Sequence, residues 1–217
     1  MRKVLFSICA LFMTVCASAQ IMRTEELETY AKEKYGEKWE EAATNLASNM
    51  ELDKNSSLTY TQVIDCPGKT KEQLYVILNY WFTASFNDAN SVIQMNDKEA
   101  GCIIGQGYMS GIAQHVGGMN AYNVSIKPII KVDIKEAKIR VTYTIQSYEV
   151  SKYVSLAKMT VKEVWTLDKC FPFVAKDAHK KTSSKALVMT HAYSNVMMDK
   201  IEECVKNGLS GNEGDDW

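Results

Sequence analysis

The chain has 217 residues and a formal net charge of −1 at pH 7, with 46% hydrophobic and 24% charged residues. This length suits one globular domain with extra segments and is sufficient to bury a core. A charge close to neutral produces no general positive field, so we expect no nucleic-acid partner.

The start of the chain has the pattern of a secretory signal peptide, residues 1–19. Arg2 and Lys3 supply a positive start, residues 4–16 are almost wholly apolar, and residues 17–19 form a small-residue cleavage site. The apolar run is shorter than the about 18 residues of a membrane span, and no later run reaches that length. We therefore predict export to the periplasm or the extracellular space, with no transmembrane segment in the mature chain. A buried helix or, because Cys16 follows the apolar run, a lipoprotein are the alternatives.

Residues 20–54 are expected to form an N-terminal helix and a polar linker. The mature chain starts here and carries 23 basic and 26 acidic residues. Apolar side chains recur at helical spacing from Thr24 to Met50, with Thr24 as N-cap and Gly36 as a weak point or kink. One such stripe is not stable alone, so the helix should dock on the main domain or on a partner.

The main domain, residues 55–208, opens with a strand and a helix. Leu58 to Asp65 alternates as a strand, and Thr70 caps a helix with a broad apolar face that runs to about Phe86. Towards the end of the domain, residues 157–167 predict another strand. The last predicted helix starts at residues 182–184 and stops at Asn207-Gly208; residues 209–217 then form a disordered acidic tail.

Two apolar runs, residues 92–95 and 102–104, flank a charged turn, residues 97–101, that ends in Gly101. Glycine takes positive φ without steric cost, so this block predicts a β-hairpin, which we place in the middle of an antiparallel sheet. More glycines follow, but their spacing fails the known phosphate-loop signatures. We expect them to let Trp81 or Phe82 press onto the sheet.

The second hairpin, from Tyr122 to Tyr148, carries the most regular alternation in the chain. With a turn at Glu136-Ala137, apolar residues face apolar ones across the strands, and Asp133 faces Arg140 as an opposite-charge pair. A slip of one residue would put every apolar side chain against a polar one, so the register is well determined. One face of this hairpin should be buried and the other exposed to solvent.

The order of the elements predicts an α+β fold in two layers. Both helices of the main domain need an apolar surface, and only one face of the sheet offers it. We expect a curved antiparallel sheet of about five or more strands with two helices on one face, in the order β-α-β4-α. The N-terminal helix is an addition to this arrangement.

Three motifs resemble a known family: residues 67–69 (Pro-Gly-Lys) with the aromatic helix after them, residues 90–95 (Asn-Ser-Val-Ile-Gln-Met), and residues 97–101 (Asp-Lys-Glu-Ala-Gly). The sequence resembles the family called domain of unknown function 4468 from about Leu58 to Tyr148. The resemblance implies a fold like that of the TATA-binding protein (TBP), exported bacterial proteins and no catalytic motif. The fold name suggests DNA binding only by analogy, and export and the negative charge of the mature chain oppose it.

A group of cations is expected on the solvent-exposed face of the second hairpin, with Asp133 as the only acid beside them. This surface could hold an anionic ligand such as a lipid headgroup, an acidic polysaccharide or an acidic protein patch. The alternative is a solvated face whose lysines discourage edge-to-edge aggregation. The cations are Lys127, Lys131, Lys135, Lys138 and Arg140.

Cysteines and histidines offer weaker candidates. The mature chain keeps Cys66, Cys102, Cys170 and Cys204, which allow three disulfide pairings or could be buried free thiols. His115, His179 and His191 could pair with Cys66 or Cys102 as nucleophile and base, but no motif joins them. We expect His191 to be a packed core residue, and we predict no catalytic residue, cofactor or metal site.

Three classes of function remain after this reading. The first is a non-enzymatic binding module of the bacterial envelope, with an unknown envelope partner or anionic ligand. The second is a carrier of a small apolar ligand between helix and sheet, which large aromatics would oppose by filling the space. The third is a cysteine-dependent enzyme. The aromatics in question are Trp81, Phe82, Tyr143 and Trp165.

Overall fold

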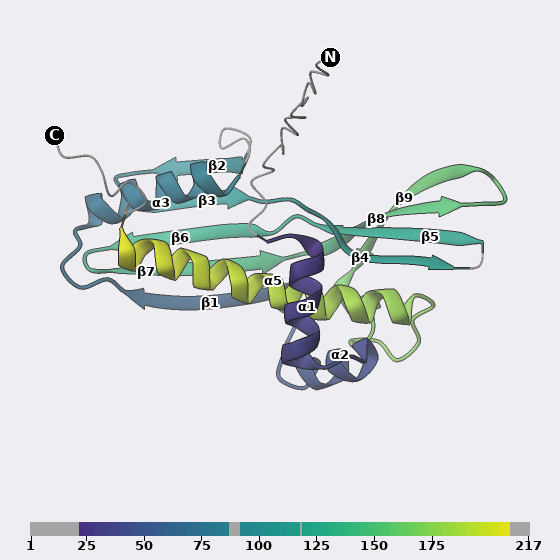
Figure 1. Ribbon diagram of the computed structural model, residues 1–217. Coiled ribbons are helices and arrows are strands. Elements are labelled where there is room, and N and C mark those ends of the chain that lie inside the picture. The colour runs from purple at the N-terminus through teal and green to yellow at the C-terminus, as the bar shows by residue number, and fades with distance from the viewer. Residues whose placement is uncertain (1–21, 87–91, 118, 209–217) are drawn as a thin grey trace, which may run out of the picture.

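A computed structural model describes residues 22–86, 92–117 and 119–208 of the chain. The predicted signal peptide, the predicted acidic tail, and residues 90 and 91 lie outside these ranges. The fold is α+β with antiparallel sheets (Figure 1), as predicted. The helices are α1 (Thr24–Tyr35), α2 (Trp39–Ala47), α3 (Lys71–Ser85) and α5 (Lys180–Asn207), with a short 3-10 helix η1 (Leu167–Lys169).

The strands form two hydrogen-bonded antiparallel sheets rather than the single sheet that we predicted. The five-stranded sheet has the order β1 (Leu58–Asp65), β7 (Lys138–Ile145), β6 (Ile129–Lys135), β3 (Cys102–Gln106), β2 (Ile93–Asp97). The four-stranded sheet has the order β4 (Met109–Gly117), β5 (Asn120–Ile126), β8 (Ser147–Val154), β9 (Met159–Thr166). Three long paths of chain, β3–β4, β5–β6 and β7–β8, run from one sheet into the other (Figure 1).

Pro128 explains why the predicted second hairpin is divided between the two sheets. Proline has no N–H to donate to a ladder, and the Pro128 carbonyl instead accepts from the Gly107 N–H at 2.9 Å. Ile129 is paired with Thr144 on one side of the break, and Ile126 with Tyr148 on the other. Three residues on one strand therefore face two on the other, which is the geometry of a bulge that bends the path.

The predicted register of the second hairpin is confirmed within β6 and β7. The turn lies at residues 136–137, where Ala137 has φ 55°, and Lys135 pairs with Lys138. Asp133 pairs with Arg140, and an ion pair of 2.8 Å joins their side chains.

The first hairpin is confirmed, but its place in the sheet is different. Asp97 pairs with Cys102, its side chain accepts from the Ala100 N–H at 2.8 Å, and Gly101 has φ 67°. However, β2 is an edge strand, so the prediction of a place in the middle was wrong. Most of its residues are exposed, and the polar Asn96 and Asp97 near its end suit an edge that must not aggregate.

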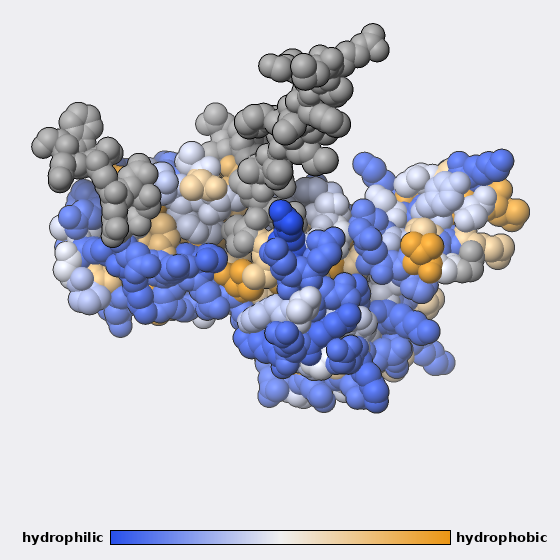
Figure 2. Space-filling model, viewed as in Figure 1, coloured by the Kyte–Doolittle hydropathy of each residue, from blue (hydrophilic) through white to orange (hydrophobic). Residues whose placement is uncertain are grey.

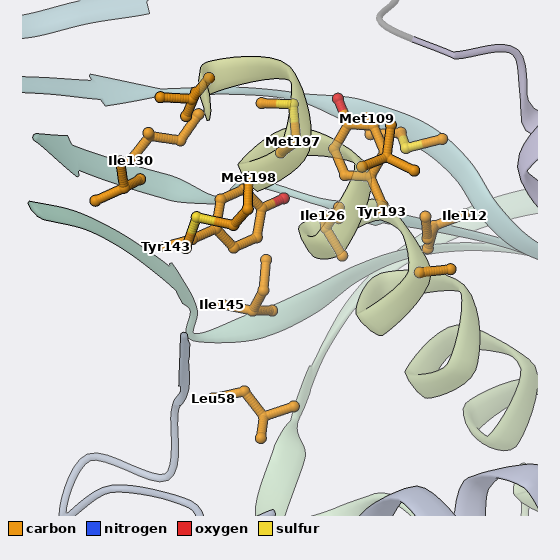
Figure 3. Packing of buried hydrophobic residues seen from close by; sticks show 14 of the residues in the cluster. Leu58, Met109, Ile112, Ile126, Ile130, Tyr143, Ile145, Tyr193, Met197 and Met198 are labelled. Carbon is orange, nitrogen blue, oxygen red and sulfur yellow. The ribbon is translucent and has the colours of Figure 1, made fainter. Parts of the chain in front are cut away.

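Helices α3 and α5 cover the same face of the sheets, as predicted (Figure 1). A Cβ atom added to Gly105 of β3 would lie 2.5 Å from Phe82 Cε1 of α3, so the absence of a side chain lets the ring press onto the strand. Helix α5 contacts β1, β4 and β5 and spans the break between the sheets. Figure 3 shows its Tyr193, Met197 and Met198 among the apolar side chains of both sheets.

The N-terminal segment forms two helices instead of one. Gly36 takes φ 101°, which ends α1 because L-residues with a side chain rarely adopt that conformation. Both helices dock on α5, and an ion pair of 2.6 Å between Glu28 and Lys185 joins α1 to it. A kink at Gly36 and docking on the main domain were both expected. Helix α5 begins at Lys180, slightly earlier than predicted.

Candidate functional site

The face of the five-stranded sheet opposite α3 and α5, called the open face below, carries most of the predicted basic residues. Alternation along β6 and β7 sends Val132 and Val141 into the core and leaves the neighbouring charged side chains on the other side. Lys131 and Lys135 come from β6, while Lys138 and Arg140 come from β7.

A shallow hollow of about 160 Å³ lies on the open face at the β6–β7 end. The structure therefore brings together Lys135, Lys138 and Arg140, three of the five predicted cations. Val63 of β1 adds an apolar wall that is 59% exposed, and Asp133 adds one acid. The lining residues are Val63, Asp133, Lys135, Lys138, Ile139 and Arg140.

Asp133 is the electrostatic centre of this hollow. Its carboxylate accepts from Arg140 Nε at 3.1 Å and Nη2 at 2.8 Å, and Lys131 Nζ lies 2.8 Å away. Burial alone would raise the pKa of Asp133, but the hydrogen bonds from Lys131 and Arg140 outweigh it and lower the pKa. The carboxylate therefore stays charged and holds two cations in place.

More acids accompany the predicted cations than the sequence suggested. Lys138 lies 4.0 Å from Asp65 of β1, and Lys127 pairs with Glu149 of β8 at 2.8 Å. Lys127 thus belongs to the junction between the sheets and does not line the hollow. Lys135 is exposed and has no acidic partner within 4 Å among the described residues.

A second concave surface, called the distal groove below, lies between the four-stranded sheet and the start of α5. It brings His115 of β4 and His179 of the α5 N-cap together around Tyr122 of β5, at ring-centroid distances of 6.5 and 5.0 Å. The groove has a volume of about 610 Å³. Its lining residues are Glu40, His115, Gly117, Met119, Asn120, Tyr122, Ala178, His179, Lys180, Lys181 and Thr182.

Aromatic stacking holds His179 of this groove in place. The His179 ring stacks on Trp165 of β9 at 4.6 Å with an interplanar angle of 3°. Trp165 Nε1 donates to Glu163 at 3.0 Å, and this bond is the largest cause that lowers the pKa of Glu163. Lys152 lies 3.4 Å from the same carboxylate. No local pattern in the sequence predicts this group, because its members come from separate segments of the chain.

A buried serine in the first turn of α5, next to the residues that line the distal groove, has a structural role. Ser183 is fully buried and donates to Asp177 at 2.5 Å, and Asp177 also accepts from the His179 backbone N–H at 2.7 Å. The carboxylate thus fixes the first turn of α5. Among the described residues there is no group of three His, Cys, Asp or Glu side chains that could hold a metal ion.

All four cysteines in the described part of the chain are free thiols, so none of their three possible disulfide pairings is present. Cys66, Cys102 and Cys170 are buried. Burial raises the pKa of each thiol, and that of Cys170 reaches about 12. A nucleophilic cysteine needs the opposite shift, since the thiolate is the reactive form.

His191 is a packed histidine of α5, as expected. Its Nδ1 lies 3.3 Å from the Tyr60 hydroxyl, and its ring meets Tyr35 of α1 edge-on at 5.2 Å. Burial, with a smaller contribution from Lys34, lowers the pKa of His191 from 6.5 to about 4. The ring is therefore neutral at neutral pH and joins α1, β1 and α5.

The space between helices and sheet is filled by side chains. Trp81, Phe82 and Tyr143 are at most 5% exposed and belong to the core, as the sequence analysis anticipated. Trp165 is only half-buried and stacks instead on His179, which lines the distal groove. Within the described ranges, no helix is long and apolar enough to cross a membrane.

Known proteins with some similarity to this chain include two solved structures. The chain is similar to the crystal structure of a TBP-like protein from Parabacteroides distasonis, with 10% identity, a TM-score of 0.48, and coverage of 71% of this chain and 96% of that one. It is also similar to the crystal structure of a DUF4468 family protein from Bacteroides ovatus, with 16% identity, a TM-score of 0.47, and coverage of 75% and 92%. No curated protein matches the chain.

The family match covers the segment that runs from β1 into β8. Residues 60–149 match the family model described as a domain of unknown function (DUF4468) with TBP-like fold. This segment contains β2, β3, β6 and β7, and with them the hollow on the open face. Residues 60–149 are therefore similar to the DUF4468 family, whose description gives a TBP-like fold.

Proposed function

We propose that this protein is an exported, non-enzymatic binding module of the bacterial envelope, and that the hollow on its open face takes an anionic ligand. The observation that carries the proposal is the group of Lys135, Lys138 and Arg140 around one hollow. Four cations surround this place once Lys131 is counted, against the two acids Asp65 and Asp133.

A local excess of positive charge is notable in a chain whose formal net charge is −1. Arg140 donates hydrogen bonds from Nε and Nη2 to Asp133, and these bonds hold its side chain in a fixed orientation. Lys135 and Lys138 are exposed and can rearrange around an incoming group. Such a site would favour acidic polysaccharides or acidic peptide segments, and added salt would weaken their binding.

Two rival functions receive less support from the site. A carrier of an apolar ligand needs an open interior, and Phe82 and Tyr143 fill the interior here. Thiol catalysis needs an accessible thiolate, and burial raises the pKa of all four thiols.

The binding proposal is tested by charge reversal at the hollow. We expect the mature protein to bind a sulfated polysaccharide and a polyglutamate peptide in low salt, and Lys135→Glu with Lys138→Glu to abolish this binding. The matched control reverses Lys169 and Lys176, two exposed lysines between β9 and α5. Equal loss in both double variants would show a general charge effect, and unchanged binding in the first would contradict the proposal.

Export is tested separately from binding. We expect the protein expressed with its own N-terminus to be recovered outside the bacterial cytoplasm, with Gln20 as its first residue. N-terminal sequencing of the recovered protein measures the cleavage point. Recovery of the uncleaved chain from the cytoplasm would contradict the export part of the proposal without affecting the hollow.

A further inference from the structure

The hairpins β4–β5 and β8–β9 end side by side, far from the open-face hollow. The Ser155 N–H donates to the Met119 carbonyl at 2.9 Å, which ties the two turns together. Both hairpins extend beyond the N-terminal end of α5 (Figure 1). We call the side chains of Val116, Met119, Leu156 and Met159, which lie at or beside these turns, the double-hairpin tip.

The double-hairpin tip exposes large apolar side chains. Val116 and Leu156 are each 85% exposed, Met119 is 66% exposed and Met159 is 51% exposed. Figure 2 shows orange side chains gathered at the end of these hairpins. One exposed apolar side chain is ordinary, but several on two adjoining turns form a patch that marks an interaction site.

The charged residues of the two segments that form the tip all have one sign. Residues 109–126 and 150–162 contain no aspartate or glutamate, although the whole chain has 26 acidic residues. The same two segments contain Lys152, Lys158 and Lys162. Lys152 pairs with Glu163, while Lys158 and Lys162 are exposed and have no acidic partner within 4 Å among the described residues.

Other charged groups near the tip do not cancel this sign. Across the distal groove, Lys180 pairs with Glu40 at 2.8 Å, and Lys181 is exposed. Because Glu40 neutralises Lys180, the groove adds one positive charge, that of Lys181, to the same end of the molecule. Apolar side chains at the extremity and cations behind them match the two layers of an anionic membrane surface, in which acyl chains lie beneath charged headgroups.

We propose that the double-hairpin tip binds a membrane surface that contains anionic lipids. Met119 and Leu156 enter between the headgroups, while Lys158 and Lys162 remain at the phosphates. Strands β5 and β8 are paired on both sides, whereas the outer edges of β4 and β9 are not paired in the sheet. Only side chains at the turns therefore enter the membrane, and both edges stay at headgroup level, where water satisfies their backbone groups. This site lies outside the open face and does not depend on the anionic ligand proposed there.

The test uses the mature protein and two kinds of vesicle, pure phosphatidylcholine and phosphatidylcholine with phosphatidylglycerol. In co-sedimentation we expect binding to the phosphatidylglycerol vesicles, and a loss of about tenfold or more when Met119→Ser and Leu156→Ser are combined. The matched control is Val76→Ser with Tyr80→Ser, two apolar side chains of α3 that are each 54% exposed. This control should bind as the parent does.

A second set of variants separates the contribution of the charges to vesicle binding from that of the apolar side chains. Lys158→Glu with Lys162→Glu should weaken binding to phosphatidylglycerol vesicles and reduce its dependence on salt. Soluble glycerol phosphate at the same phosphate concentration should not compete, because it offers no acyl layer. Competition by glycerol phosphate would show that the tip binds a soluble phosphate group and not a membrane surface, and it would overturn the proposal.

Sedimentation velocity and thermal unfolding complete the experiment. The tip variants should unfold at the parent temperature, so that lost binding reports the surface and not the fold. No binding of the parent to phosphatidylglycerol vesicles, or equal binding of the Met119→Ser, Leu156→Ser variant, would overturn the proposal. A parent dimer that this variant dissociates, without vesicle binding, would identify the tip as a self-association surface and would also overturn it.

Discussion

The five-stranded and four-stranded sheets share three long paths of chain, yet they differ in what covers them. Helices α3 and α5 cover one side of the five-stranded sheet, and ion pairs with Asp133, Asp65 and Glu149 accompany the cations at its surface and at the junction. The four-stranded sheet is covered by α5 only near the junction, and its far end exposes Val116 and Leu156. The five-stranded sheet packs against helices to form the core, and the far end of the four-stranded sheet exposes its side chains to solvent.

This difference teaches that alternation along a strand is informative only where something covers one side. In β6 and β7 the apolar residues alternate strictly because one face is buried under helices. The chain of these two strands continues into β5 and β8 of the four-stranded sheet. Beyond Tyr122 and Val150 no helix covers it, so burial does not explain the apolar side chains there. Substitutions at matched positions of the two sheets can separate these roles.

The largest expected effect comes from a single substitution made in both sheets. Gly105→Val in β3 should destabilise the fold by about 3 kcal/mol, because its Cβ would lie 2.5 Å from the buried Phe82 ring. Gly117→Val in β4 should change stability by less than about 1 kcal/mol, because the nearest atom is His115 Nε2, at 3.0 Å. Denaturant unfolding measures both. Equal losses would show that the two sheets are equally constrained.

The Phe82–Gly105 contact also shows how much the sequence could predict. Glycines in a strand context, placed after an aromatic helix, led to the correct expectation that Trp81 or Phe82 approaches them. The register of β6 and β7 was equally accessible, since both strands lie within 17 residues, Ile129 to Ile145. Patterns that involve neighbouring segments can therefore be interpreted from one sequence.

Contacts between distant segments could not be predicted in this way. Asp65 reaches Lys138 only because β1 pairs with β7, and nothing local to either strand specifies that pairing. His115 and His179 meet at Tyr122 because β4 and the start of α5 converge from far apart in the chain. The break at Pro128 is different, because the missing N–H is visible in the sequence and is a local signal against a continuous central strand.

A second prediction concerns the loss of stability at low pH that His191, on the covered side of the five-stranded sheet, should cause. His191 has a folded-state pKa of about 4 against 6.5, so between these values the unfolded chain binds more protons. Stability should therefore fall as pH decreases from about 6.5 towards 4, by about 2 kcal/mol for this partly exposed ring. Urea unfolding across this range measures the slope. His191→Gln should flatten it, and an unchanged slope would show that other groups dominate.

A smaller effect is expected on the open face, where stability and binding should change in opposite directions. Asp133→Asn removes the charge that holds Lys131 and Arg140, and it should destabilise the fold by about 1 kcal/mol. The same change removes an acid from the hollow, so it should strengthen binding of polyglutamate in low salt. Titration with the peptide, together with urea unfolding, tests both signs. Weaker binding would show that the orientation of Arg140 matters more than the net charge.

The smallest effect on stability is expected at the double-hairpin tip, and it is the most informative for the comparison. Met119→Ser with Leu156→Ser should change the free energy of unfolding by no more than about 0.5 kcal/mol, because both side chains are already largely in water. If stability falls by several times that amount, the tip belongs to the core and its exposure has no need of a ligand. If stability is unchanged while vesicle binding is lost, the apolar side chains serve only what lies outside the molecule. The four-stranded sheet would then be a support that carries this surface, as the five-stranded sheet is a support that carries the hollow.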